Sequence, residues 1–407
     1  MRLLRSLTVA SLFLPLAARA QDFSQRGFLE TTGFFFPQSA PNDSGHALSE
    51  SLFRYEAFYK AFAGLEISGG IDARFDTHLE ADREFELSWW DRSTRRPAFA
   101  VRRLSAAYHR GKLSIEAGKQ FVRWGKTDVL TPTDRFAPRD FLNVVDADYL
   151  AVTAGRLTYG TQSDTLDLVF QPRLTPSRVP LLDQRWAVLP PGILFAEAAP
   201  SFPGGPQFGA RWNHIGAAAE YSFSFYNGYD NLPLYNAQLQ PAPLRVDLQR
   251  FYPQMRMYGA DVAVPLRWVT VKAEAGYFTS STTQSDEYAL YVVQLERQAG
   301  EWSLVAGYAG QAITAHGTSF VYSPERGLTR ALVARAAYTV DTNRSLAFET
   351  VVRQNGAGMY FKPEYSQAVG QHWRATAGFA LIRGRDGDFL GQYRRNSFAI
   401  LTVRYSF

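Results

Sequence analysis

The chain has 407 residues, with 43 lysines and arginines against 38 aspartates and glutamates, for a formal net charge of +5 at pH 7. It contains no cysteine, which excludes a disulfide framework and thiolate metal sites. The charge is weak and no run of basic residues accompanies it, so nucleic acid is not an expected partner. Aromatic residues reach 14 %, yet beyond the first 20 residues no apolar stretch approaches the roughly 20 residues of a membrane-spanning helix.

Residues 1–20 have the features of a secretory signal peptide. Two arginines form a charged start, residues 7–17 are apolar, and Ala18-Arg19-Ala20 is a small-x-small cleavage site. Removing this leader takes away three arginines and lowers the net charge to about +2. We expect the remaining chain, 21–407, to be a single exported domain.

After the leader, the chain is built from segments that alternate in polarity. In 65–75, 217–225 and 269–277 the odd-numbered residues are apolar, while the even-numbered side largely carries charge, hydroxyl or glycine. A period of two places these residues on opposite faces of a β-strand. The last segment, 399–407, repeats the pattern and finishes on an aromatic ring. Strands with one apolar and one wet face are typical of a membrane β-barrel.

The lengths of the connections support the same interpretation. Eighteen strands are predicted, starting near residues 25, 50, 64, 98, 112, 149, 164, 206, 216, 254, 267, 287, 301, 330, 344, 358, 372 and 396. Connections after even-numbered strands are tight, whereas most of those after odd-numbered strands are long, at 77–97, 123–148, 173–204, 227–252 and 312–328. Hydrocarbon offers no hydrogen-bond partners, so every strand must pair on both edges. The predicted fold is all-β: a closed antiparallel transmembrane β-barrel with short periplasmic turns and long external loops, sixteen strands being the alternative count.

Alternation also predicts the residues that face the lumen. A lysine or arginine on the lipid face costs about 2–4 kcal/mol near the bilayer midplane, so the charges of the strands are expected to point inward. Both signs occur in similar number, which argues against a basic eyelet built by the strands. The predicted lumen-wall residues are Arg54, Glu56, Asp72, Arg74, Arg103, Glu116, Arg211, Glu220, Lys272, Glu274, Arg335, Glu349, Arg353, Lys362, Glu364, Arg374 and Arg404.

External loop 3, residues 123–148, mixes charges of both signs with aromatic residues and with two prolines that limit its flexibility. A loop of this composition can fold inward and pack on the lumen wall. Its candidate pore-constriction residues are Arg123, Trp124, Lys126, Asp128, Asp134, Arg135, Arg139 and Asp140. The alternative is that these residues only stabilise the conformation of the loop.

External loop 4, residues 173–204, combines six prolines with many apolar side chains. A free surface loop seldom keeps so many apolar groups in water, so this loop is expected to cover the barrel mouth or a neighbouring subunit. The apolar part, 181–195, would form a lid that favours a less polar permeant, such as an aromatic or acyl compound.

Three short motifs near loop 3 add a resemblance. The chain carries Gly118-Lys119-Gln120, then Trp-Gly-Lys-Thr-Asp at 124–128, then Thr-Pro-Thr-Asp at 131–134. It thereby resembles a family of Gram-negative outer-membrane barrels described as porin-like or alginate-export-like, although Thr131 stands where that family has asparagine, so the turn chemistry is only partly kept. In general porins the third external loop narrows the pore. The resemblance implies that Arg123, Trp124, Asp128 and Asp134 shape the constriction, and that the last strand, with Tyr405 and Phe407, is the signal for the barrel-assembly machinery.

No catalytic or metal-binding motif accompanies this pattern. The six histidines are scattered without a short-spaced zinc pair, and no Gly-x-Ser-x-Gly elbow, Walker loop or Rossmann glycine pattern occurs. The chain is therefore expected not to be an enzyme and to need no cofactor. We expect a channel for passive diffusion of an unidentified small molecule across a Gram-negative outer membrane, in contact with lipid and lipopolysaccharide and narrowed by loops 3 and 4. The alternatives are a non-conducting structural or partner-binding barrel and a carrier for hydrophobic compounds.

Overall fold

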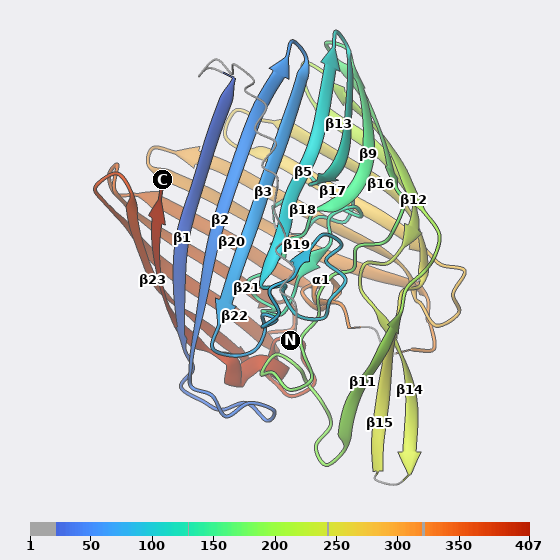
Figure 1. The fold of residues 1–407 in the computed structure, drawn as a ribbon, viewed down its shortest axis with the longest axis vertical. Coiled ribbons are helices and arrows are strands. Elements are labelled where there is room, and N and C mark those ends of the chain that lie inside the picture. Colours follow the sequence, from blue (N-terminus) through green and yellow to red (C-terminus); the bar gives the residue numbers. More distant parts are fainter. Residues whose placement is uncertain (1–21, 129, 242–243, 320–321) are drawn as a thin grey trace, which may run out of the picture.

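Eighteen antiparallel strands form a closed wall with tight turns at one end and long loops at the other (Figure 1). The structure is a computed structural model that describes residues 22–128, 130–241, 244–319 and 322–407. The predicted signal peptide, 1–20, lies outside the described residues. The closed barrel with eighteen strands is confirmed, and each predicted strand start lies within four residues of an observed one. No helix of the described chain is long and apolar enough to cross a membrane.

The wall strands follow one another in chain order, each paired with the next. They are β1 (Phe23–Phe35), β2 (Ala47–Phe62), β3 (Leu65–Asp76), β5 (Phe99–Arg110), β6 (Leu113–Gln120), β9 (Val152–Gly160), β10 (Asp164–Gln171), β12 (Gln207–Ile215), β13 (Glu220–Tyr229), β16 (Gln254–Pro265), β17 (Thr270–Thr279), β18 (Glu287–Ala299), β19 (Trp302–Ala315), β20 (Ala331–Thr339), β21 (Arg344–Arg353), β22 (Gly358–Val369), β23 (Trp373–Gly384) and β24 (Phe398–Ser406). The loops carry β4 (Leu87–Ser88), β7 (Arg139–Asp140), β8 (Asp148–Tyr149), β11 (Leu194–Ser201), β14 (Leu234–Pro241), β15 (Leu244–Phe251), the helix α1 (Pro324–Gly327) and the 3₁₀ turn η1 (Gly391–Asn396).

The first and last strands close the barrel. β1 pairs with β2 along one edge and with β24 along the other, in a register that runs from Phe28 opposite Ser406 to Phe35 opposite Ala399. Beyond this register, the backbone groups of Gly27 and Phe407 exchange two hydrogen bonds of 3.0 Å. No wall strand is left with an open edge, which is the condition for placing a sheet in hydrocarbon.

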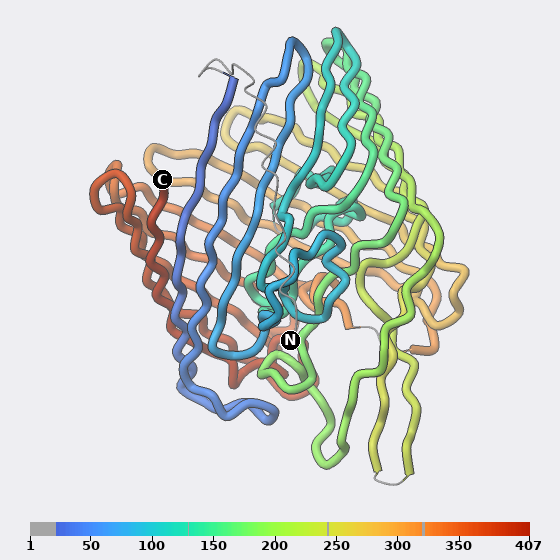
Figure 2. The backbone as a smooth tube through the Cα atoms, viewed as in Figure 1, coloured from blue at the N-terminus to red at the C-terminus, as the bar shows by residue number. Residues whose placement is uncertain are grey.

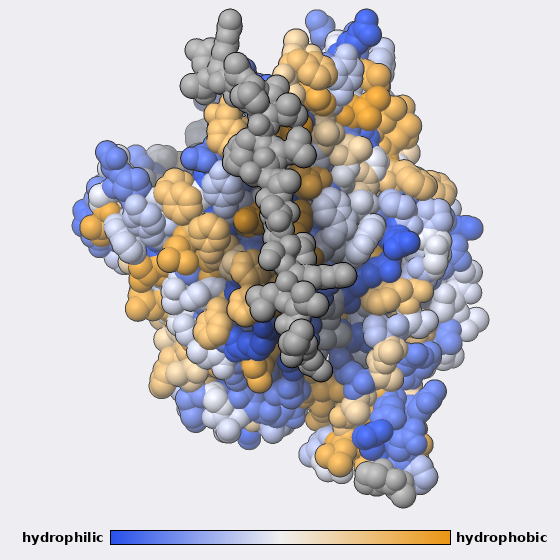
Figure 3. Space-filling model, in the orientation of Figure 1, coloured by the Kyte–Doolittle hydropathy of each residue, from blue (hydrophilic) through white to orange (hydrophobic). Residues whose placement is uncertain are grey.

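The two faces of the wall differ as the alternation predicts. Leu29 and Phe223 are 50 % and 58 % exposed on the outer face, while charged residues gather inside. Figure 3 shows apolar side chains over the wall strands on one side of the molecule and hydrophilic ones towards the rims. Near the turn end, Trp302 lies against Tyr338 at 4.8 Å and Trp373 against Tyr405 at 5.0 Å between ring centroids, an arrangement suited to the headgroup layer.

Loops 4 and 5 contain a small sheet that the sequence pattern did not predict. β11 pairs in parallel with β15, which pairs antiparallel with β14, and the three strands project beyond the barrel at its loop end (Figure 2). The expectation of plain loops at 173–204 and 227–252 is therefore corrected. β11 and β15 are far apart in the sequence, and short-range alternation cannot report such a pairing.

The contact between Gly27 and Phe407 gives a test of the closing seam. A Cβ atom on Gly27 would lie 2.6 Å from the Phe407 ring and 2.8 Å from the Arg54 carbonyl oxygen. We predict that Gly27→Val destabilises the folded barrel by about 1–3 kcal/mol, because the closing strand must shift to make room. The readout is the urea midpoint of the heat-modifiable, folded band on unheated gels.

The matched control is Gly33→Val on the same strand and face, where a Cβ would meet nothing nearer than 4.0 Å. Equal loss of stability in the two variants would contradict the importance of the Gly27–Phe407 contact.

Candidate functional site

The lumen contains a cavity of about 550 Å³. It is bounded by the inner faces of β1, β2, β3, β5 and β22 to β24, and by parts of loop 2 (residues 77–97), loop 3 with its flanks, and loop 4. Its charged lining is balanced in sign. The cations are Arg54, Arg74, Arg96, Arg102, Arg178, Lys362, Arg374 and Arg404, and the anions are Glu30, Glu50, Asp72, Asp91, Asp140, Asp146, Asp148 and Glu364.

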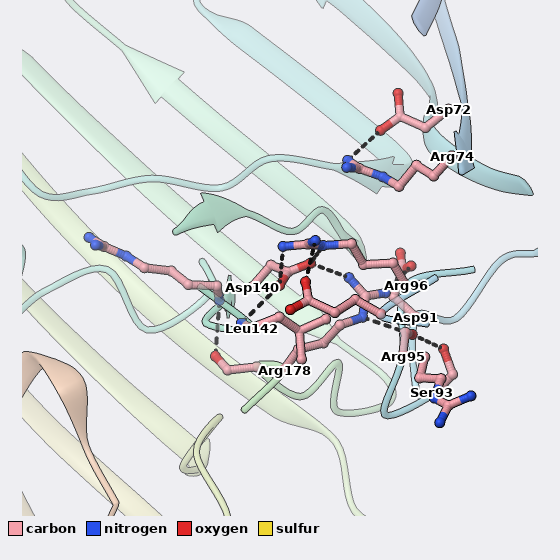
Figure 4. Close-up of polar contacts among 12 residues, drawn as sticks. Asp72, Arg74, Asp91, Ser93, Arg95, Arg96, Asp140, Leu142 and Arg178 are labelled. Carbon is pink, nitrogen blue, oxygen red and sulfur yellow. Dashed lines mark hydrogen bonds and ion pairs between the residues drawn. The ribbon is translucent and has the colours of Figure 1, made fainter. Parts of the chain in front are cut away.

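One part of this wall carries excess positive charge, because three arginines converge on Asp72. Arg54 donates from Nε and Nη2 to the two carboxylate oxygens at 2.7 and 2.9 Å, and Arg74 donates at 3.1 Å (Figure 4). Arg102 lies 3.8 Å from Asp72 and 3.8 Å from Glu56. Three guanidinium groups thus share two carboxylates beside a confined space, where a local field attracts small anions.

The adjoining wall, β22 to β24, holds further charges. Arg404 pairs with Glu30 at 2.6 Å, and Lys362 pairs with Glu364 at 3.2 Å. Arg374 stands opposite Arg404 in the β23–β24 register and donates to Ser366 at 3.2 Å. Paired charges of this kind line the wall with polar groups without giving it one sign.

Loop 3 folds inward and fills the other half of the lumen. Its Trp124, Leu130 and Phe136 are buried against inward-facing apolar residues of the wall, among them Met257 and Leu290. The Trp124 indole also donates to Asp167 of β10 at 2.9 Å. Apolar packing and polar contacts therefore hold the loop against β9, β10, β13 and β16 to β19.

A buried carboxylate on β17 anchors the loop backbone. Glu274 accepts hydrogen bonds from the Lys126 amide at 2.9 Å, from the Thr127 hydroxyl at 2.9 Å and from the Thr133 amide at 2.8 Å. Nearby, Asp128 and Gln294 exchange two hydrogen bonds of 2.9 and 2.8 Å. These hydrogen bonds attach the loop to the wall at several points. The position of the loop is therefore determined by its own contacts as well as by the two strands that it connects.

Asp134 organises the start of loop 3 from within. Its carboxylate accepts from the amides of Trp124 and Gly125 at 2.5 and 2.7 Å and from Arg123 Nε at 3.2 Å. A Cβ on Gly125 would lie 2.7 Å from the Thr131 side chain, so a larger residue would break this turn. The motif found in the sequence is thus a compact, internally bonded structure.

The eight candidate constriction residues are distributed unevenly around the passage. Asp140 lines the large cavity. Trp124, Asp134 and Arg135 are buried within the loop and its supports, with exposed fractions of 2 %, 4 % and 8 %. Because these three side chains are buried, they determine where the loop lies but are not part of the surface that faces the lumen.

The other four candidates also make contacts that hold the loop. Lys126 pairs with Glu220 and with Asp261, each at 2.9 Å, and Arg139 approaches Glu325 of α1 at 3.7 Å. Asp128 borders a separate pocket of about 120 Å³. Arg123 has an exposed side chain that rests over the ring of Tyr149, and Tyr149 does line the large cavity.

Of the seventeen predicted lumen-wall residues, seven line the cavity: Arg54, Asp72, Arg74, Lys362, Glu364, Arg374 and Arg404. Ion pairs join neighbouring strands at Arg54–Asp72, Arg103–Glu116, Lys272–Glu296 and Arg404–Glu30. Arg102 was missed. The β3–β5 register skips it, since Ile71 stands opposite Val101 and Gly70 opposite Arg103. This β-bulge turns Arg102 and Arg103 to the same side, which strict alternation forbids. The doubled arginine was its only sequence signal.

A second group, of which the sequence analysis named only Asp140, joins loops 2, 3 and 4. Arg96 donates to Asp140 at 2.9 Å and to Glu80 at 2.9 Å, while Arg178 donates to Asp140 at 3.1 Å and to Asp91 at 2.9 Å (Figure 4). We call these five residues the inter-loop cluster. All five are buried, so the three loops are tied together at one desolvated point beside the cavity.

The protonation of the cluster depends on its burial and on its neighbours. Burial opposes ionisation of Asp140, but Arg96 and Arg178 outweigh it and hold the pKa of Asp140 well below its ordinary value. Burial raises the pKa of Glu80 to about 8, helped by the nearby carboxylates of Glu50 and Asp140 and opposed by Arg96. Glu80 is therefore the member of the cluster that changes charge in a mildly alkaline range.

Part of loop 4 closes over the mouth of the barrel. The Arg185 guanidinium lies over the Phe36 ring and pairs with Asp43, both of loop 1 (36–46), while Trp186 packs against Tyr393 of η1. Leu181 and Trp186 are buried at 4 % and 3 % exposure. The later apolar residues Val188, Ile193 and Leu194 are exposed and lead into β11. We call residues 181–187 the mouth segment.

Comparison with known proteins gives likeness in fold only. No family model and no curated protein matches the chain. Among solved structures, a BenF-like porin from Pseudomonas fluorescens Pf-5 aligns with a TM-score of 0.56 at 10% identity, over 95% of this chain and 98% of that chain. OccAB4 of Acinetobacter baumannii aligns with a TM-score of 0.55 at 9% identity, over 95% and 99%. The outer membrane protein opdK from Pseudomonas aeruginosa aligns with a TM-score of 0.54 at 9% identity, over 94% and 98%.

The raised pKa of Glu80 predicts a pH effect on stability. The folded state keeps the Glu80 proton to about pH 8, whereas the unfolded chain releases it near 4.5. The folded state binds more protons in this range, so the free energy of unfolding falls as pH rises through it. In Glu80→Gln the melting temperature should fall less between about pH 6 and about pH 9 than in the wild type.

The control is Glu84→Gln, which removes an exposed carboxylate of the same loop. Identical pH profiles for the wild type and Glu80→Gln would contradict the assignment of this titration to Glu80.

Proposed function

We propose that this protein is an outer-membrane porin of a Gram-negative bacterium, a non-enzymatic channel through which small polar solutes diffuse passively. The observation that carries the proposal is the closed wall, apolar outside, around a cavity lined by charges of both signs. Hydrated, charged lumen walls suit permeants that carry their own polar groups. The likeness in fold to solved porins supports the same conclusion.

The proposal extends to features that the sequence alone raised. Two sequence motifs, Gly-Lys-Gln at 118–120 and Trp-Gly-Lys-Thr-Asp at 124–128, support kinship with the porin-like, alginate-export-like barrels. A role of loop 3 in narrowing the passage is supported by its packing inside the barrel, and a role of Phe407 in assembly by its position at the closing seam.

Two other functions are weaker. A carrier for hydrophobic compounds would use the apolar residues of loop 4, but Leu181 and Trp186 are buried among other loops and do not line the cavity. A non-conducting barrel that binds a partner is favoured by the mouth segment and by the sheet of β11, β15 and β14. The partner-binding barrel remains the second candidate, because this function would leave the charge-lined cavity without a role.

Conductance separates the two candidates. The purified protein, inserted into planar bilayers, should give steady conductance steps, since a water-accessible lumen carries ions. Silent bilayers, with insertion verified by protease protection, would contradict the porin and favour the partner-binding barrel.

The mouth segment should limit passage. Arg185→Gln removes a buried ion pair and its stacking on Phe36, a change that costs about 3–5 kcal/mol when one partner is left behind. We predict larger conductance steps and faster swelling of liposomes in small sugars. Arg245→Gln, which removes an ion pair of β15 on the projecting sheet, is the control. Unchanged conductance in Arg185→Gln would contradict a lid at this position.

The arginines around Asp72 should set charge preference. Arg102→Gln removes a cavity-lining cation, and we predict that the anion-to-cation permeability ratio falls by about twofold or more, because the local field weakens. The reversal potential in a salt gradient measures this ratio. Arg103→Gln, on the neighbouring position but paired with Glu116 and outside the cavity lining, is the matched control. A larger effect of Arg103→Gln would contradict the assignment.

A further inference from the structure

Two arginines without acidic partners lie side by side where loop 2 meets loop 4. Arg92 belongs to loop 2 and Arg173 begins loop 4. Neither forms an ion pair with any residue that the structure describes, although most buried or half-buried arginines of this chain do. Burial, together with the nearby charge of Arg173, lowers the pKa of Arg92. Two neighbouring positive charges that have no acidic partner repel each other, and a bound anion would stabilise them.

Aromatic rings fix the positions of both guanidinium groups. Arg92 lies over the Phe202 ring at 4.7 Å and Arg173 over the Trp90 ring at 5.3 Å. Arg92 Nε donates to the Leu174 carbonyl at 3.0 Å, while its Nη2 is buried and has no hydrogen-bond partner. Stacked guanidinium planes with free donors match the geometry of a phosphate group.

The segment that carries Arg92 touches the outer side of the wall, and neither arginine is among the residues that line the cavity. The Trp89 indole donates to the Thr153 hydroxyl at 3.1 Å. Thr153 faces outward on β9, because its neighbours Val152 and Ala154 are the inward, buried positions. Loop 2 therefore reaches the outer side of the wall at Trp89, while its Asp91 lines the cavity.

Lipid-facing aromatic residues lie next to the pair. Arg173 follows the end of β10 by two residues. Just before it, Phe170 of β10 stands opposite Phe208 of β12, and the two rings are 53 % and 48 % exposed on the outer face. Directly beyond an apolar surface at the loop end of the barrel lies the headgroup layer of the outer leaflet.

We propose that Arg92 and Arg173 bind a phosphate group of lipopolysaccharide, whose acyl chains then lie against Phe170 and Phe208. The arginines supply charge-assisted hydrogen bonds to the phosphate, and the exposed rings supply the apolar contact that a free anion does not need. This binding goes beyond the proposed function, because it requires no conduction and engages the outside of the wall.

The test uses the purified full barrel titrated with diphosphoryl lipid A, with dephosphorylated lipid A and with inorganic phosphate, and bound ligand is counted by native mass spectrometry. The variants are Arg173→Gln alone and with Arg92→Gln. Arg374→Gln, which changes a lumen arginine that forms no ion pair with a described residue, is the charge-matched control. Folding of each variant is checked by heat modifiability, and the exposed Arg173 is not part of the buried core.

We expect the wild type and Arg374→Gln to bind diphosphoryl lipid A at least about tenfold more tightly than the dephosphorylated form, and the double variant to lose this preference. Arg173→Gln should fall between them. Equal binding of the two lipid A forms by the wild type, or an unaltered preference in both variants, would overturn the site. Inorganic phosphate bound as tightly as diphosphoryl lipid A would overturn the lipid assignment and leave a site for a free anion.

Discussion

The structure depends on one constraint: in hydrocarbon every backbone N–H and C=O group must find its partner within the protein, since an unpaired group costs several kcal/mol. The seam between β1 and β24 meets this condition and brings the two ends of the chain together. It also places Glu30 beside Arg404 and so builds part of the cavity from residues more than 370 positions apart. Closure is thus both the source of stability and the origin of the candidate site.

Within this wall the loops decide how much of the lumen is open. Loop 3 occupies one half because Glu274, Asp167 and the apolar inner face of β13 and β16 to β19 offer it buried hydrogen bonds and packing. The other half keeps the cavity, since its wall is lined by arginines and carboxylates that favour water. The inter-loop cluster and the mouth segment then join loops 1, 2, 3 and 4 and η1 above it. The residues that position a constriction are therefore mostly buried, and the residues that a solute meets are those of the wall.

Much of the barrel was predictable because one physical rule, the period of two between lipid and water, acts on every strand. The prediction fails where the structure depends on something other than this alternation. The bulge in β5 turns Arg102 inward against the alternation, and the sheet of β11, β15 and β14 depends on pairing between distant segments. Likewise the sequence marks Asp134 and Trp124 as special but not as buried, and it does not indicate that Arg96, Asp140 and Arg178 from three loops meet. Such tertiary contacts have no local signature.

The most direct test of the central claim, a sealed tube with an apolar exterior and a wet interior, is accessibility along one strand. The natural chain has no cysteine, so single cysteines at 400–405 on β24 report without background. Ile400, Thr402 and Arg404 line the cavity, while Leu401, Val403 and Tyr405 face outward. In outer-membrane vesicles the even positions should react with a small water-soluble thiol reagent and the odd positions only with a lipid-soluble one. Uniform reaction at all six positions, or reaction without alternation, would contradict the account.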